Sequence, residues 1–218
     1  MELDVLECTA GAVMEHGGTI DKIVGDAVVV DQYAPLADER MRAQQLGLVD
    51  LSTLPRVGFK GQGTPDWLRA HGWVPPLQAN TATAQNDGAL MAALSTHEVL
   101  VLSDLAARSE AVSQLTSAYS AGAPTRSYIL PRADSHACLA LCGQHAAEML
   151  AKVCGVDLRP GHFDNHQVAQ TSLARVNAII IRDDLGQTLS YHILSDVSSI
   201  EFLWDSLLDA AIEFDGAP

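Results

Sequence analysis

Basic residues are the scarcest charged groups in this chain. Its 218 residues include 13 Lys and Arg against 27 Asp and Glu, which gives a formal net charge of −14 at pH 7. Nucleic-acid phosphates and anionic membranes both require basic surfaces for binding. The charge balance therefore argues against both kinds of partner, and it leaves few cations for an anionic ligand.

Long apolar runs and familiar catalytic motifs are also missing. No stretch reaches the roughly 18 apolar residues that a membrane-spanning helix needs. The N-terminal sequence MELDVLEC lacks the basic start of a secretory signal, and the 4 cysteines are typical of reduced cytoplasmic thiols. The sequence contains neither a glycine-rich dinucleotide or phosphate loop nor a G-x-S-x-G motif. We therefore expect a cytoplasmic chain that carries no flavin.

A strand, helix and strand in succession form the clearest pattern that is present. His136–Cys142 is an apolar run of strand length, and residues 144–153 have apolar positions at helical spacing. Gly155 and Pro160 then end the helix, and the β-branched residues of 168–181 predict a strand. This unit occupies the second half of the sequence.

A weaker copy of the unit occurs earlier. Residues 57–72 align with residues 139–155 and place Gly61 on Gly143. We predict an α+β fold in which two pseudo-repeats, each ordered strand, helix, strand, strand, helix, pack as one domain. The expected boundaries are an acidic N-terminal arm at 1–45 and a duplicated domain at 46–218, with halves at about 46–122 and 127–218. The helices near Thr64 and Gln144 are predicted to superpose.

Several local elements are predicted from capping, turn and periodicity signals. Thr64 is expected to cap a short helix, residues 72–87 to form a long loop, and residues 104–120 to form a helix. The last helix is expected to open on a capping box of Ser198 and Glu201. Its apolar stripe places Trp204 on the buried face. Strands are also expected at residues 27–30, 88–94, 98–103, 178–182 and 189–194.

One cluster of sulfur and imidazole groups has two readings. His136, Cys138, Cys142 and His145 invite a metal site, but their spacing matches structural zinc sites poorly. Cysteine is also among the residues most often fully buried. We predict buried thiols and no metal site. His162 and His166 are expected in a solvated or partner-contacting loop.

Three large side chains fall in segments expected to be exposed loops. Trp73 lies in the loop of residues 72–87, and Arg159 and Phe163 lie in a second loop at 156–167. Tryptophan, phenylalanine and arginine are enriched at protein interfaces. We predict that these three residues contact a partner. No catalytic residue is identified.

Runs along most of the sequence resemble one known family. The first half contains GLVDLSTLPRVGFKGQG and NDGALMAALSTHEVLVLSD, and the second contains AKVCGVDLRP, VAQTSLARVNAIIIRDD, YHILSD and FLWDSLLDAAIEF. These runs resemble the gamma subunit of heterotetrameric sarcosine oxidase, which is related to the folate-binding part of the glycine-cleavage T-protein. The resemblance covers residues 46–216.

The resemblance implies a non-catalytic subunit in a complex with alpha, beta and zinc-binding delta subunits. FAD, FMN, NAD and tetrahydrofolate are then expected on those partners, and the complex oxidises sarcosine to glycine and passes a one-carbon unit to tetrahydrofolate. The T-protein pattern has an acidic pair where this sequence has Met91 and Ala92. Two alternatives remain: a free-standing folate-binding or aminomethyltransferase-like protein, and a subunit of another N-methyl-amine oxidase.

Overall fold

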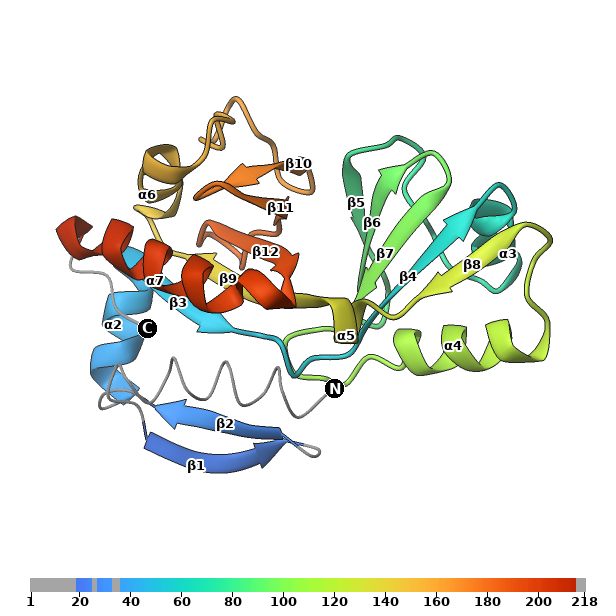
Figure 1. Ribbon diagram of the computed structural model, residues 1–218, viewed down its shortest axis with the longest axis horizontal. Helices are drawn as coiled ribbons and strands as arrows, with labels where there is room; N and C mark the ends of the chain where they lie inside the picture. The colour runs from blue at the N-terminus through green and yellow to red at the C-terminus, as the bar shows by residue number, and fades with distance from the viewer. Residues whose placement is uncertain (1–18, 25–26, 33–35, 215–218) are drawn as a thin grey trace. The chain divides into compact units, whose positions relative to one another are not determined.

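The computed structural model describes the backbone of residues 19–24, 27–32 and 36–214, and the side chains of residues 41–214 (Figure 1). The chain forms two compact units. Unit 1 comprises Met1–Thr53, His136–Asn165 and Thr171–Pro218, and unit 2 comprises Leu54–Ser135 and His166–Gln170. Among the described residues, no helix is both long enough and apolar enough to cross a bilayer.

Unit 1 is built on a five-stranded sheet in the order β10-β11-β12-β9-β3. The strands are β10 (Val168–Leu173), β11 (Val176–Arg182), β12 (Ser190–Asp196), β9 (His136–Cys142) and β3 (Gly47–Asp50). The pairs β11–β12, β12–β9 and β9–β3 are antiparallel. Helices α6 (Ala146–Val153) and α7 (Ile200–Ala211) follow β9 and β12, each with an apolar face.

The core of unit 1 follows from strand alternation. Leu139, Leu141, Tyr191 and Ile193 alternate along the two central strands and are completely buried. Helix α7 buries Leu203, Trp204 and Leu207, so the sequence prediction for Trp204 is confirmed. The predicted stripe is shorter than expected, because Ile212 beyond the helix is 70% exposed.

Unit 2 has a second five-stranded sheet, in the order β5-β6-β7-β4-β8. Its strands are β5 (Thr81–Ala84), β6 (Leu90–Ser95), β7 (Glu98–Leu102), β4 (Arg56–Gly61) and β8 (Ser127–Leu130), and its helices are α3 (Thr64–Ala70), α4 (Ala111–Ala121) and α5 (Arg132–Ser135). Phe59, Trp67 and Tyr119 form an aromatic cluster with ring centroids 5.4–5.8 Å apart. This cluster joins α3 and α4 to the sheet.

The two sheets share one strand order. In chain order, β4, α3, β5, β6, β7 and α4 correspond to β9, α6, β10, β11, β12 and α7. The fifth strand of each sheet comes from the other half: β3 precedes β4 but pairs with β9, and β8 precedes β9 but pairs with β4. Each unit has three strands between its two helices, whereas the predicted repeat had two, and superposition of the two units stays a prediction.

Two glycines make this exchange possible. Gly61 ends β4 with φ +142, and a Cβ there would lie 2.0 Å from the Arg126 carbonyl oxygen, next to β8. Gly143 follows β9 with φ +112, and its Cβ would lie 2.5 Å from the Gln45 carbonyl oxygen, next to β3. Only glycine combines this backbone conformation with such close approach. Gly61 and Gly143, which align in the sequence, therefore allow the same close approach of the backbone beside an edge strand in each unit.

Three predicted elements are wrong in extent. Residues 168–181 form two strands, because Ala174 and Arg175 adopt positive φ values and turn the chain into a hairpin. Residues 72–87 include β5 within the expected loop. Helix α4 begins only at Ala111, because the Asp104 carboxylate accepts hydrogen bonds from the backbone of Arg108 and Ser109 and holds the preceding segment in a turn.

Both predicted helix caps also differ. The N-cap of α3 is Gly63, and the Thr64 hydroxyl instead hydrogen-bonds the Ser127 hydroxyl at 3.0 Å. The Ser198 amide donates to Asp196, which caps a short 3-10 turn, η1 (Val197–Ser199), before α7. The capping box of Ser198 and Glu201 is therefore wrong, because η1 displaces the helix start.

The N-terminal segment contains a two-stranded sheet and a helix. Strands β1 (Thr19–Val24) and β2 (Ala27–Gln32) pair antiparallel, which confirms the predicted strand at residues 27–30. Helix α2 (Leu36–Leu46) then leads into β3. The rest of the predicted arm, residues 1–18, lies outside the described residues.

Candidate functional site

Strand β6 contains Met91 and Ala92, the positions where the T-protein pattern has an acidic pair, and Asp87 lies in the turn before it. Met91 and Ala92 are completely buried in β6, between β5 and β7. The nearby Asp87 carboxylate accepts from the Ala89 amide at 3.1 Å and from the Ser109 hydroxyl at 2.7 Å. No carboxylate therefore stands at positions 91 and 92, and the neighbouring one is engaged in holding the turn.

A pocket of about 430 Å³ lies in unit 2 beside this turn. Its walls are the segment of residues 72–74, the end of β5 and the start of α4. The Gln85 side chain bonds both the amide and the carbonyl of Val74 at 3.0 Å, which ties two of these walls together. Trp73 lines the pocket and packs against the core of unit 2. The predicted partner residue Trp73 is thus half-buried at a pocket wall.

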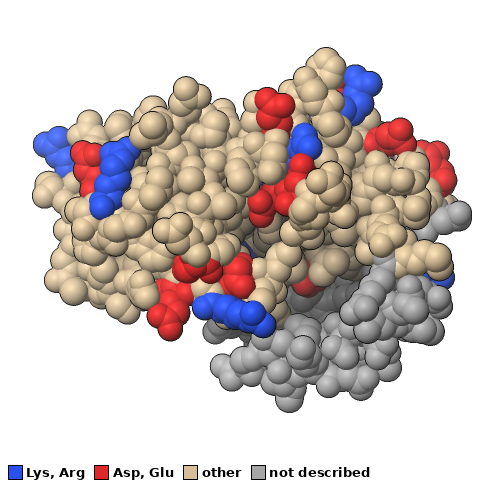
Figure 2. Space-filling view, turned by 180° about the vertical axis from the view of Figure 1, so that it is seen from behind, with Lys and Arg blue, Asp and Glu red and all other residues tan. Residues whose placement is uncertain are grey.

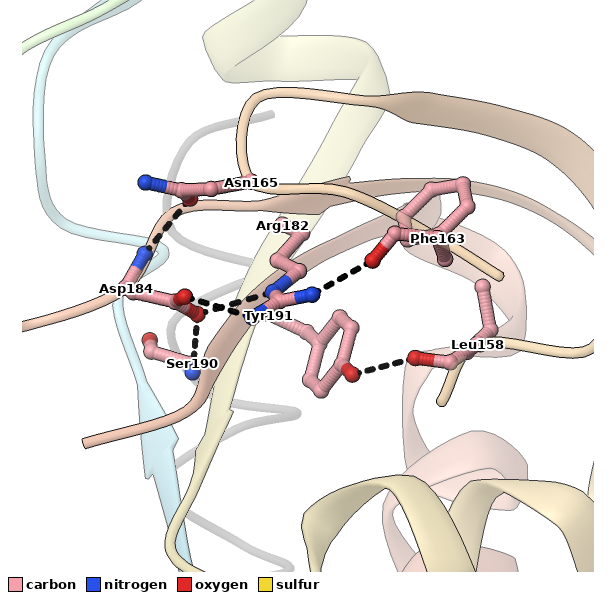
Figure 3. A network of polar contacts seen from close by, with 7 residues as sticks. All are labelled: Leu158, Phe163, Asn165, Arg182, Asp184, Ser190 and Tyr191. Carbon is pink, nitrogen blue, oxygen red and sulfur yellow. Dashed lines mark hydrogen bonds and ion pairs between the residues drawn. The ribbon is translucent and has the colours of Figure 1, made fainter. Parts of the chain in front are cut away.

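Unit 1 contains a polar network that fastens its long loop to the β11–β12 hairpin (Figure 3). Arg182 forms two bonds to Asp184, Nε to Oδ1 at 3.0 Å and Nη2 to Oδ2 at 2.7 Å. Arg182 also donates to the Phe163 carbonyl, and the Tyr191 hydroxyl donates to the Leu158 carbonyl. The Asp184 amide donates to the Asn165 side chain at 3.0 Å.

These contacts hold the loop of residues 156–167 against the β11–β12 hairpin. The Arg182 and Asp184 side chains are 11% and 18% exposed, so their paired bonds are shielded from water. Burial raises the pKa of Tyr191 to about 12, which keeps its hydroxyl protonated as a donor. Residues 156–167 therefore have a fixed backbone, although the sequence predicted only a polar loop.

The two residues of this loop that were predicted to contact a partner, Phe163 and Arg159, differ in exposure. Phe163 is 6% exposed, so the expectation of an exposed contact there is wrong. Arg182 donates to the Phe163 carbonyl, and the ring is covered by the chain's own atoms. Arg159 is exposed and forms a paired contact with Asp157, whose pKa its guanidinium lowers. Its role as a partner contact stays a prediction.

Buried thiols and no metal site were predicted for the cluster of His136, Cys138, Cys142 and His145. His145 pairs with Glu148 at 2.9 Å, and Cys138 and Cys154 are buried free thiols. Cys142 is half-buried, and burial raises the pKa of its thiol. Among the described side chains, no group of three or more His, Cys, Asp or Glu is placed to hold a metal ion. His162 and His166 belong to different units.

His192 is a buried titratable group that the sequence analysis did not single out. It sits on β12, with Nε2 3.4 Å from Asp183 and its ring beside Cys138. Burial acts to lower its pKa, but the bonds to Asp183 and Cys138 outweigh it and raise the pKa to about 9. The structure pairs His192 with Ala140 of β9, a register that the sequence of β12 alone does not give.

The raised pKa predicts how stability depends on pH. A group whose pKa is 6.5 unfolded and about 9 folded stabilises the protein fully below pH 6.5, and this contribution is lost as pH rises through 9. Asp183→Asn should therefore lower the free energy of unfolding more at pH 6 than at pH 9.5, as measured by urea denaturation. Glu201→Gln, an exposed change on α7, should show no such slope. A loss from Asp183→Asn that is equal at all pH values would contradict the assignment.

The chain shares its fold with solved structures, although its sequence finds no match. No protein-family model and no curated protein matches the sequence. Among solved structures, the chain is similar to one in the heterotetrameric sarcosine oxidase from Corynebacterium sp. U-96 in complex with pyrrole 2-carboxylate. The TM-score is 0.68 at 22% identity, over 98% of this chain and 96% of that one.

A second similar structure is the glycine cleavage system aminomethyltransferase T from Bartonella henselae. Its TM-score is 0.70 at 14% identity, over 92% of this chain but only 56% of that one. The chain thus spans about half the length of the aminomethyltransferase. These two structures confirm, at the level of fold, the relation that the sequence runs suggested.

Proposed function

We propose that this chain is a gamma-like, non-catalytic subunit of a multi-subunit sarcosine oxidase. The observation that supports this most is the extent of the structural match. The match to the sarcosine oxidase chain covers 98% of this chain and 96% of that one at a TM-score of 0.68. It also has the higher sequence identity, 22% against 14% for the aminomethyltransferase, which favours the subunit over the transferase.

The described side chains support a role by contact. Transfer of an aminomethyl group needs a positioned acid or base to handle the proton on the amine, and a carboxylate is the natural choice. Met91 and Ala92 cannot supply one, and Asp87 already accepts two hydrogen bonds. In this proposal the chain stabilises its partners rather than performing a chemical step.

The partners in this proposal are alpha-, beta- and delta-like subunits in the cytoplasm. They carry FAD, FMN, NAD, tetrahydrofolate and zinc, and this chain carries none of these groups. Trp73 and Arg159 are the side chains proposed to contact them. On the face shown in Figure 2, Lys and Arg side chains are few and lie near Asp and Glu side chains, which favours a protein partner over a polyanion.

Co-expression with the subunits encoded beside this chain tests the proposal. We expect one complex whose mass equals the sum of the subunits, and an oxidase of lower yield or stability when this chain is omitted. The isolated chain should have no sarcosine oxidase activity. An oxidase that assembles normally and is equally stable without the chain would contradict the proposal.

The second candidate is a free-standing folate-binding or aminomethyltransferase-like protein, which the T-protein fold favours. Steady turnover by the chain alone, with tetrahydrofolate and an amine donor, would support it and refute the subunit role. The third candidate, a subunit of another N-methyl-amine oxidase, is separated from the first by the substrate that the purified complex oxidises.

A further inference from the structure

The pocket in unit 2 has a charge pattern that no structural role accounts for. Arg108, Asp87 and Glu110 all line it, together with Trp73 and Val74. Arg108 is exposed, and its guanidinium has no hydrogen bond or ion pair with any residue that the structure describes. An unpaired cation therefore faces the same space as two carboxylates.

Asp87 and Glu110 differ in how many of their carboxylate oxygens already accept a hydrogen bond. Asp87 accepts one bond on each of its oxygens and holds the turn before β6. Glu110 accepts from the Gln114 amide through Oε2 alone, at 2.9 Å, so its Oε1 is open among the described residues. Glu110 and Arg108 form no ion pair with each other within 4.0 Å. Each can therefore receive a separate group of a ligand.

We propose that this pocket binds a small amino acid, with its carboxylate on Arg108 and its ammonium group on Glu110. A guanidinium recognises a carboxylate through two parallel bonds. An ammonium group is attracted to a carboxylate such as that of Glu110, and Trp73 lines the same pocket. A purely anionic ligand would meet two carboxylates, and a purely cationic one would leave Arg108 unpaired. A zwitterion satisfies both sets of charges.

The remaining walls favour an apolar or aromatic side chain on that amino acid. The pocket volume of about 430 Å³ exceeds what an ammonium and a carboxylate group fill, and it falls in the usual range for small-ligand sites. Trp73, Val74 and Ala84 provide its apolar surface. The Gln85 bonds to Val74 hold this wall in place without a ligand.

Three probes that differ only in their charged groups test the proposal on the isolated chain. L-phenylalanine carries both charges, phenethylamine lacks the carboxylate, and 3-phenylpropionate lacks the ammonium group. Isothermal titration calorimetry should show saturable binding of L-phenylalanine, at least tenfold tighter than either analogue. This test does not depend on the proposed subunit role, because no partner is present.

Two substitutions assign each charge to its residue. Arg108→Gln should weaken L-phenylalanine at least tenfold and leave phenethylamine unchanged, while Glu110→Gln should weaken L-phenylalanine and phenethylamine but not 3-phenylpropionate. Arg69→Gln and Asp66→Asn remove an exposed pair on α3 outside the pocket and should change nothing. Arg108 and Glu110 are both exposed, so near-ultraviolet circular dichroism should confirm unchanged folding.

Three results would overturn the proposal. One is the absence of saturable L-phenylalanine binding. Another is an analogue that binds as tightly as the zwitterion, which would make the pocket a site for a single charge. The third is equal L-phenylalanine affinity in the parent and Arg108→Gln proteins, which would place the ligand elsewhere.

Discussion

Gly61→Ala is expected to destabilise unit 2 by roughly 2–5 kcal/mol, from backbone strain and steric overlap together. The residue has φ +142, a conformation that side chains of L-residues rarely adopt. The new methyl group would also meet the Arg126 carbonyl oxygen at 2.0 Å, and that atom is backbone that cannot rotate away. Relief requires β8 to move from β4, which breaks the register that begins at Gly61 and Ser127.

The three tryptophans allow the two units to be followed separately. Trp67 and Trp73 lie in unit 2, and Trp204 is the single tryptophan of unit 1. The tryptophans that remain in a Trp204→Phe background report unit 2 alone, and Trp204 in a Trp67→Phe/Trp73→Phe background reports unit 1 alone. Urea unfolding followed by fluorescence should then show the loss from Gly61→Ala in unit 2 and the loss from Gly143→Ala in unit 1.

Two other glycines serve as controls for these variants. Gly72 has φ +84 but open space around a new Cβ, so Gly72→Ala should cost only the backbone term of about 1–2 kcal/mol. Gly122 has neither a positive φ nor a near neighbour, and its change to alanine should be close to neutral. A loss at Gly61 no larger than that at Gly72 would mean that β8 yields freely, and the close packing of the exchanged strand would be refuted.

Trp204→Ala is the second change with a large expected effect, a loss of about 3–5 kcal/mol, the usual range for a large aromatic in a core. Trp204 is 3% exposed and lies on the face of α7 that also buries Leu203 and Leu207. Phe202 on the same helix is 53% exposed and provides the control, because Phe202→Ala removes little buried surface.

A milder substitution separates the packing of Trp204 from its polar atom. The indole Nε1 is buried and forms no hydrogen bond with any residue that the structure describes. An unpaired buried donor costs about 1–3 kcal/mol, and Trp204→Phe removes it. This gain should offset much of the stability that is lost with the smaller ring.

Thermal unfolding of Trp204→Ala that matches the parent would show that the side chain does not stabilise unit 1.

Local patterns predicted most of the elements because periodicity and turn residues act over a few positions. Strand β9, helix α7 and the strands predicted at residues 178–182 and 189–194 were found in this way. The hairpin between β10 and β11 was missed because Ala174 and Arg175 are not residues that normally signal a left-handed turn. Alanine and arginine at positive φ give no sequence signal, unlike glycine, asparagine or aspartate.

Contacts between distant residues could not be predicted in the same way. Strands β3 and β8 have only four residues each, and so short a strand says nothing about its partner. Phe163 was expected to be exposed because it lies in a polar loop, and the bond from Arg182, 19 positions later, to its carbonyl leaves no local sequence signal. The pocket combines residues from three segments, and only Trp73 among them carried a sequence signal.

The exchange of edge strands has a consequence for the order of events during synthesis. Chains leave the ribosome from the N-terminus at about 5–20 residues per second. All five strands of the unit 2 sheet lie between Arg56 and Leu130, so that sheet can close while β9 is still unmade. Strand β3 appears earlier than any of them, yet its partner begins only at His136. A nascent chain that has left the ribosome as far as Ser135 should therefore hold one completed sheet, while β3 still lacks the strand with which it pairs.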